Sequence, residues 1–198
     1  MAMVGLRHAV FAPITKETEG EALVYGTGVI VGRMMQADVT YERNTDPLYA
    51  DDVEAENDNS ITGGTVTIGV DDIADEARVV VFGDYQDGET GEYEDNSQAS
   101  PYGGFGYVRE RRYKGKSSFV AYWIHKLQFG STTESAQTKA NTITWQTPTL
   151  TGNLMGVNNN EAGKIRFRRR KEFDKAAEAI NWVNEKANLA AATAQTGA

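Results

Sequence analysis

The clearest pattern along the chain is an alternation of apolar and polar residues over positions 29–43. Met35, Ala37, Val39 and Tyr41 alternate there with Gln36, Asp38, Thr40 and Glu42. Successive side chains of a β-strand point to opposite faces, so this segment predicts a long strand with one apolar and one polar face. Segment 61–70 repeats the pattern, with Val66, Ile68 and Val70 opposite Thr65, Thr67 and Gly69.

Four later segments also have the composition of strands. Segments 102–113 and 117–129 are separated by the turn sequence KGK, which predicts a β-hairpin. Segment 140–155 is rich in Thr and Ile, and Pro148 within it indicates a bulge or an edge position. Segment 164–172 predicts a strand with a basic face.

Two segments predict helices. Segment 71–83 begins with acidic residues and ends at a glycine, as helices do, although its V-V-V run is equally typical of a strand. Segment 172–190 predicts an amphipathic helix with Ala176, Ile180 and Val183 on one face.

The order of these elements bears on the fold class. Strands come first and do not alternate with helices, which favours a mainly β or α+β protein built as a sandwich. We expect a β-sandwich domain over 1–171, with an N-terminal arm and two long acidic loops at 44–60 and 84–101. A C-terminal helix with an extended tail follows over 172–198.

The formal net charge of −8 conceals a strong asymmetry. Residues 51–95 contain fifteen Asp or Glu and one basic residue, Arg78, for a net charge of −14, so the rest of the chain carries +6. The positive charge is concentrated in two runs, RERRYKGK at 109–116 and KIRFRRRK at 164–171. This separation suggests that acidic and basic parts meet, either within one chain or between copies.

Few residues suggest catalysis or a cofactor. The chain has no Cys, which excludes disulfides, thiolate metal sites and Cys nucleophiles. The acidic stretch 51–62 lacks the Gly and the final Glu of an EF-hand loop, and the glycines of 26–32 lead into a strand rather than a helix, unlike a dinucleotide loop. His125 is expected in a strand, on one face with Trp123 and Leu127. We expect no catalytic residue, cofactor or metal, no signal peptide, and no membrane insertion.

Several stretches carry a resemblance: LYADD, GGTVTIGVDDI, PYGGFGYVRE, YKGKSSFVAYWIHKLQFGSTTESAQTK and ITWQTPTLTG. Over about residues 5–155 the chain resembles the major tail proteins of bacteriophages with long, non-contractile tails, of the family typical of phages of Gram-positive bacteria. The resemblance implies a β-sandwich subunit with a flanking helix, without enzymatic activity. Six copies form a ring, rings stack into the tail tube, and each copy lends four strands to a continuous barrel.

The resemblance also implies partners and a location. The partners are further copies of the chain, the tape-measure protein, the tail terminator and the distal tail protein, and double-stranded DNA passes through the tube during ejection. Such a subunit is assembled in the host cytoplasm and located in the virion. Twenty-four strands about 4.8 Å apart and tilted by roughly 40° give a barrel radius of about 24 Å, which leaves room for hydrated DNA.

The alternating strands then predict the lining of the channel. The apolar faces should pack against the subunit's own core, and the polar faces should line the lumen. The lumen candidates are Gln36, Asp38, Thr40, Glu42, Thr65, Thr67, Thr144 and Gln146. Acidic and hydroxyl groups leave phosphates hydrated, so DNA would slide without binding.

The charged runs predict contacts between subunits or rings, with segment 48–60 meeting a basic run of another copy. The candidates are Asp51, Asp52, Glu54, Glu56, Asp58, Arg109, Arg111, Arg112, Arg166, Arg168, Arg169 and Arg170. Two alternatives remain open. One is a monomeric β-sandwich module that binds carbohydrate or a host surface, and the other is a different phage structural component, such as a decoration or receptor-binding protein.

Overall fold

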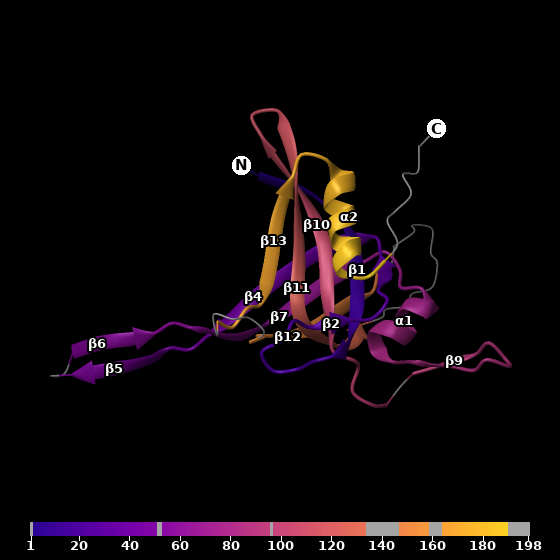
Figure 1. Ribbon diagram of the computed structural model, residues 1–198, viewed down its shortest axis with the longest axis horizontal. Coiled ribbons are helices and arrows are strands. Elements are labelled where there is room, and N and C mark those ends of the chain that lie inside the picture. The colour runs from indigo at the N-terminus through magenta and orange to yellow at the C-terminus, as the bar shows by residue number, and fades with distance from the viewer. Residues whose placement is uncertain (1, 51–52, 96, 134–146, 159–163, 190–198) are drawn as a thin grey trace, which may run out of the picture.

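The computed structural model describes residues 2–50, 53–95, 97–133, 147–158 and 164–189. This part of the chain is mainly β, with one large antiparallel sheet and two short helices (Figure 1). The order of strands along the sheet is β2-β1-β10-β11-β12-β7-β4, with β3 paired to β1 and β13 paired to β11. The mainly β composition agrees with the sequence-based expectation.

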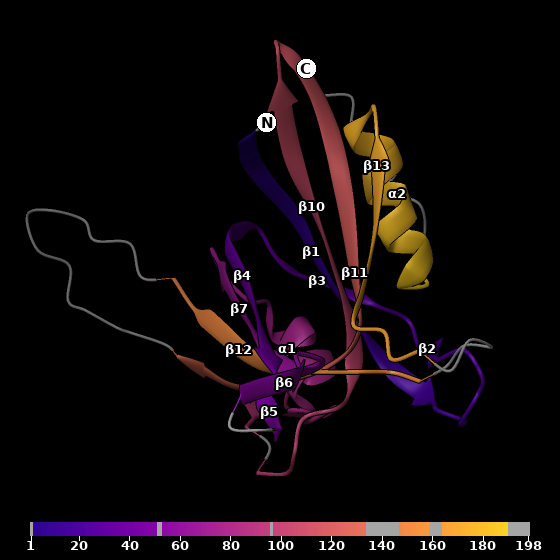
Figure 2. The same cartoon turned by 90° about the vertical axis from the view of Figure 1, so that its left-hand side faces the viewer.

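The large sheet is built from strands of very different length. Its members are β1 (Ala2–Lys16), β2 (Val24–Tyr25), β3 (Val29–Gly32), β4 (Met34–Arg43), β7 (Ile61–Val70), β10 (Gly103–Tyr113), β11 (Lys116–Thr133), β12 (Thr149–Met155) and β13 (Arg168–Phe173). The first half of β11 lies between β10 and β13, and its second half pairs with β12. One long strand therefore connects the two parts of the sheet (Figure 2).

The expected hairpin over 102–129 is confirmed as β10 and β11. Lys114 and Gly115 occupy the turn with φ values of 48° and 80°, so both adopt the left-handed conformation. Two residues with positive φ form the hairpin turn whose twist matches that of the flanking strands, and glycine adopts this conformation without strain. The KGK signal was therefore sufficient to locate this hairpin.

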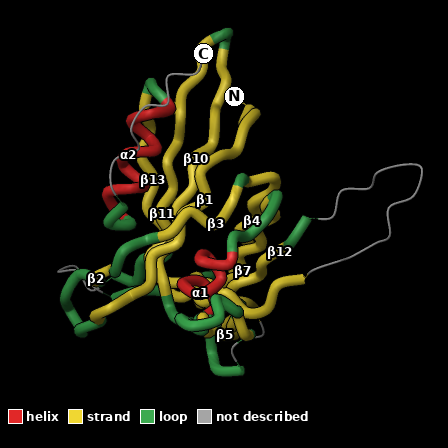
Figure 3. Tube along the Cα trace, turned by 90° about the vertical axis from the view of Figure 1, so that its right-hand side faces the viewer, coloured by secondary structure: helices red, strands yellow, loops and turns green. Residues whose placement is uncertain are grey.

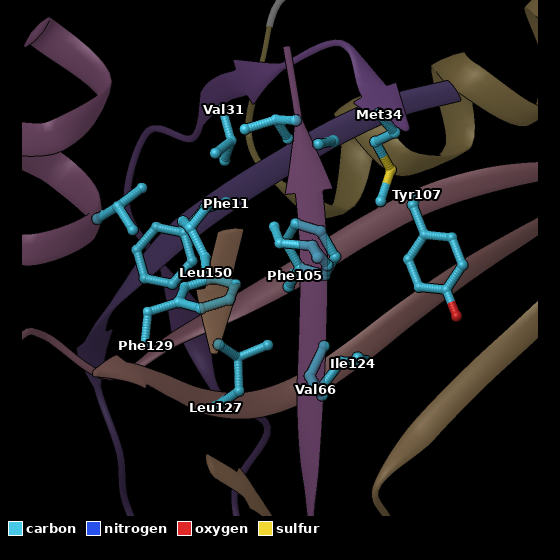
Figure 4. Packing of buried hydrophobic residues seen from close by; sticks show 14 of the residues in the cluster. Phe11, Val31, Met34, Val66, Phe105, Tyr107, Ile124, Leu127, Phe129 and Leu150 are labelled. Atoms are coloured by element: carbon cyan, nitrogen blue, oxygen red, sulfur yellow. The ribbon is translucent and has the colours of Figure 1, made fainter. Parts of the chain in front are cut away.

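The main hydrophobic core lies between the two parts of the sheet. Side chains from β1, β7, β10, β11 and β12 meet in it, among them Phe11, Val66, Phe105 and Phe129 (Figure 4). The Phe105 and Phe129 rings are edge-to-face with centroids 5.6 Å apart, a favourable geometry for aromatic pairs. The apolar side of the alternating strands thus packs against the chain's own interior.

Helix α2 (Ala176–Lys186) covers the opposite face of β10, β11 and β1, and Figure 3 shows it beside β13. Its Ala179 and Val183 are buried against Trp123 of β11 and Val108 of β10. Gly106 makes this approach possible, because a Cβ there would lie 2.5 Å from Val183. The helix expected over 172–190 is confirmed, with a shorter extent.

Helix α1 (Asp75–Phe82) lies within the segment 71–83 that predicted a helix. Gly83 ends it in the left-handed conformation, with φ of 79°, as glycine commonly does after a helix. Ala77 and Val81 are buried in the main core, which explains why the V-V-V run is helical here.

The structure corrects four details of the sequence analysis. Segment 29–43 forms two strands, because the strand is interrupted at Arg33 and a register shift follows between Met34 and Gln36. Met34 is consequently buried, while Met35, expected on the apolar face, is 61% exposed. The N-terminal segment, expected as an arm, is strand β1 and pairs with β10 along most of its length.

The third and fourth corrections concern a loop and a shared face. Segment 44–60, expected as a loop, contains an antiparallel hairpin of β5 (Asp46–Ala50) and β6 (Val53–Asp58). The described residues of 84–101 contain the short pair β8 (Tyr85–Gln86) and β9 (Tyr93–Glu94). Trp123 packs against α2 and Leu127 lies in the main core. Opposite Gly103 and Phe105 of β10, strand β11 advances three residues from Ile124 to Leu127, and this extra residue reverses the side-chain alternation between Trp123 and Leu127.

Candidate assembly surfaces

The polar face of the sheet is continuous over β4, β7 and β12. Gln36, Asp38, Thr40 and Glu42 are exposed, and Thr65 and Thr67 are half-buried beside them. The pairing aligns Asp38 with Thr67 and Thr151, and Thr40 with Thr65, Asn153 and Gln128. The predicted lumen residues that the structure describes therefore lie on one face, whereas Thr144 and Gln146 lie outside the described residues.

Sequence reasoning missed part of this polar face. Thr149, Thr151 and Asn153 of β12 alternate with the buried Leu150 and Leu154. The same period-2 signal is present in the sequence TLTGNLM, but Thr144 and Gln146, further upstream, were predicted as the polar positions of this strand. The rows that contain Asp38 and Thr40 include no Lys or Arg among the described residues. Lys126, two residues before Gln128 on the same side of β11, is a cation of this face and is paired with Glu17 at 2.6 Å.

Strand β4 is the last strand of this part of the sheet. It pairs with β7 on one side, and no described strand pairs with its other side. An edge strand of ten residues offers a row of backbone N–H and C=O groups to another chain. The polar face therefore ends at an edge suited to pairing with a further strand.

The acidic stretch projects from the body of the chain as the β5–β6 hairpin (Figure 1). Carboxylates stand directly opposite each other at Asp46 and Asp58, and Glu56 stands opposite Leu48. Hydrogen bonds from the Asn44 side chain and from the backbone and hydroxyl of Ser60 lower the pKa of Asp58. Asp51 and Asp52 lie outside the described residues, and Glu54 belongs to β6.

The two basic runs, distant in sequence, converge on one face of the sheet. Arg109 and Arg111 of β10 follow the core residues Phe105 and Tyr107 on the same side of the strand, and Arg168 and Arg170 occupy that side of β13. We call Arg109, Arg111, Arg168 and Arg170 the arginine face. Arg112 and Arg169 point to the other side of the sheet, where α2 lies, and Arg166 precedes β13 in a bridge to Val157.

These arginines differ in their partners. Arg111 donates to Glu172 at 2.9 Å. Arg168 lies over the Tyr122 ring, 4.8 Å from its centroid, and donates to the Tyr107 hydroxyl at 3.4 Å. Arg109 and Arg170 form no ion pair within the described part of the chain, so they are the members of the arginine face open to an external partner.

His125 is buried near cationic groups. Burial lowers its pKa to about 4, with further contributions from Arg169, Arg166 and Lys186. Its backbone N–H donates to the Phe167 carbonyl at 3.0 Å, which fixes the chain just before β13. His125 is therefore a neutral residue at neutral pH and belongs to the connection between β11 and β13.

Metal centres and membrane-spanning helices are two other features that bear on function. Among the residues that the structure describes, no three His, Asp or Glu side chains are grouped so that they could hold a metal ion. Neither described helix is long and apolar enough to cross a membrane.

A comparison with protein-family models found no match, and a search of curated proteins found no significant match.

Proposed function

We propose that the chain is a virion structural protein that polymerises as stacked hexameric rings into the tail tube of a long-tailed bacteriophage. The observation that carries the proposal is the sheet of β4, β7 and β12, whose inner side is packed with Val66, Ile68 and Leu150 while its outer side is polar. Such a sheet faces its own core on one side and water on the other. The sequence resemblance described above supports the same function.

The open edge of β4 fits this role. In the proposed ring, β4 of one copy pairs with the end of the corresponding sheet in the next copy, so that no edge is left exposed. Four strands from each copy, β4, β7, β12 and the second half of β11, would supply the barrel. Closing the barrel would give a pairing partner to this ten-residue edge strand, whose outer side pairs with no described strand.

The polar face suits the passage of DNA. Binding of duplex DNA depends on Lys and Arg that displace counterions from phosphates. The rows of Asp38 and Thr40 carry a carboxylate and hydroxyl or amide groups instead, and Lys126 on the same face is paired with Glu17, so a duplex would remain hydrated along it. The tape-measure protein, the tail terminator and the distal tail protein are the other partners that this function implies.

Negative-stain electron microscopy of the purified chain at increasing concentration tests the proposal. Rings or long hollow tubes are the expected result. Dispersed particles at every concentration and salt condition, together with affinity for a glycan, would instead support a monomeric β-sandwich binding module. A second test uses Asp38→Lys with Glu42→Lys, which should form tubes that retain duplex DNA at low salt, whereas wild-type tubes release it.

A further inference from the structure

The arginine face and the acidic hairpin are oppositely charged surfaces that do not meet within one copy of the chain. The hairpin forms a separate two-stranded sheet, and it lies apart from β10 and β13 in both Figure 1 and Figure 2. Segment 44–60 has six carboxylates and no Lys or Arg. The segment therefore contains no cationic residue of its own that could compensate this charge.

The hairpin is poorly suited to stand alone in water. An isolated two-stranded hairpin is marginally stable, and like charges directly opposite each other destabilise the pairing further. Asp46 and Asp58 form such a pair. A cationic surface that approaches the hairpin would relieve this repulsion, so the hairpin's own structure favours a basic partner.

The arginine face, in turn, has few carboxylates to balance its positive charge. Along the same side of β10, β11 and β13, Glu172 is the one carboxylate in the described strands, and Arg111 already pairs with it. Arg170 is exposed, and Arg109 borders a hollow of about 310 Å³ with a mixed lining, in which Met3, Leu6 and Met35 lie beside Gln36 and Asp38. The surface thus combines arginines that have no ion pair among the described residues with an accessible recess of mixed polarity.

We infer that the β5–β6 hairpin of one copy docks on the arginine face of a second copy, with Arg109 and Arg170 as its principal cationic contacts. This inference refines the proposed function, because it names the contact through which copies associate. Arg112 and Arg169 lie on the other side of the same strands, so we expect them to take no part in this contact.

The absence of cysteine from the chain permits a direct test by cross-linking. Glu56→Cys and Arg170→Cys proteins are mixed and oxidised, and the mixed disulfide is quantified on a non-reducing gel. The matched control replaces Arg170→Cys with Arg169→Cys, one residue away on the opposite side of β13. We expect the Arg170→Cys mixture to give several times more mixed disulfide than the control, and equal yields would overturn the inference.

Charge reversal gives an independent readout. Glu54→Lys with Glu56→Lys, or Arg109→Glu with Arg170→Glu, should each weaken association between copies by about tenfold at low salt, measured by sedimentation. Mixing the two variants should restore association, since each altered surface then meets an opposite charge. The control Arg112→Glu with Arg169→Glu should associate like the wild type. Failure of the mixture to recover would contradict direct pairing.

The outcomes separate this inference from the proposed function. Wild-type tubes with equal cross-linking of Arg170→Cys and Arg169→Cys would retain the tube function and refute the docking contact. Selective cross-linking without rings or tubes would retain the contact and refute the tube. If Arg109→Glu with Arg170→Glu loses duplex-DNA binding while cross-linking stays at the control level, the arginine face is a nucleic-acid surface and the inference is wrong.

Discussion

Arg168 provides the sharpest test of how the charged residues divide between folding and assembly. Its guanidinium lies 4.8 Å from the centroid of the Tyr122 ring and 5.8 Å from that of Tyr41, and it donates to the Tyr107 hydroxyl at 3.4 Å. These contacts connect β13 to β10 and β11 and also reach β4. Arg168→Ala removes all of them while leaving the backbone pairing of β13 intact.

The expected cost follows from these contacts. Two cation–π contacts of a partly exposed arginine contribute about 0.5–1 kcal/mol each, and a long hydrogen bond to a neutral hydroxyl adds about 0.5 kcal/mol. The sum is about 2 kcal/mol, and a domain of this size loses about 2–4 °C in Tm for each kcal/mol. We therefore expect Arg168→Ala to lower Tm by about 4–8 °C.

Differential scanning calorimetry or thermal circular dichroism measures this shift, with Arg169→Ala as the exposed control on the same strand. In a Tyr122→Leu background the nearer ring is absent, so Arg168→Ala should cost about 1 kcal/mol less. A Tm within about 1 °C of the wild type would refute the reasoning and return Arg168 to the residues available for intersubunit contacts. The result also decides the design of assembly variants, because reversing Arg168 together with Arg169 and Arg170 would remove the Arg168 contacts that stabilise the fold as well as surface charge.

Three further predictions concern pH, packing and the polar face. The pKa of His125 is about 4 in the folded chain and 6.5 in the unfolded chain, so the unfolded chain binds more protons between these pH values. The free energy of unfolding should therefore fall by up to about 3 kcal/mol as the pH decreases from 6.5 to 4. His125→Gln should reduce this decline, as measured by urea titrations at several pH values. Gly64→Ala should lower the free energy of unfolding by about 1–3 kcal/mol, because the new Cβ would lie 2.2 Å from the Thr40 carbonyl oxygen. Gly69→Ala should be tolerated, because the nearest atom to its Cβ lies at 3.4 Å. Chemical denaturation of both variants under the same conditions checks this difference. Asp38→Lys should change monomer stability by less than about 0.5 kcal/mol because the residue is exposed, so a larger loss would indicate a structural role rather than a lining one.

The strands and faces could be predicted where the period-2 pattern is unbroken. Val66, Ile68 and Val70 are buried as the alternation indicated, because the sheet has one side in the core. The prediction for Met35 was wrong because Met35 lies within the register shift between Met34 and Gln36, and such shifts leave little trace in composition. The hairpin at 46–58 was missed for a different reason: Asp, Asn and Glu have low strand propensity, and the pairing lacks the usual alternation.

The convergence of the two basic runs was beyond sequence reasoning. Arg109 and Arg170 are 61 positions apart in number, and they share a face because β11 pairs with both β10 and β13. No local pattern states which strands are neighbours in a sheet. The sequence could indicate that the basic runs meet an acidic partner, but only the topology divides their arginines between two sides.

The register of the strands therefore determines on which side of the sheet each charged side chain lies. The arginine face continues the core side of the sheet beyond the last buried residues, while the polar face with Asp38 and Thr151 is the other side of its neighbouring strands. A slip of one residue in β10 would turn Arg109 and Arg111 toward α2 and place Glu110 and Arg112 on the arginine face. The pairs Arg7–Glu110 at 3.2 Å and Arg111–Glu172 at 2.9 Å form only in the observed register, so surface ion pairs of small individual energy act here mainly by favouring one alignment of strands.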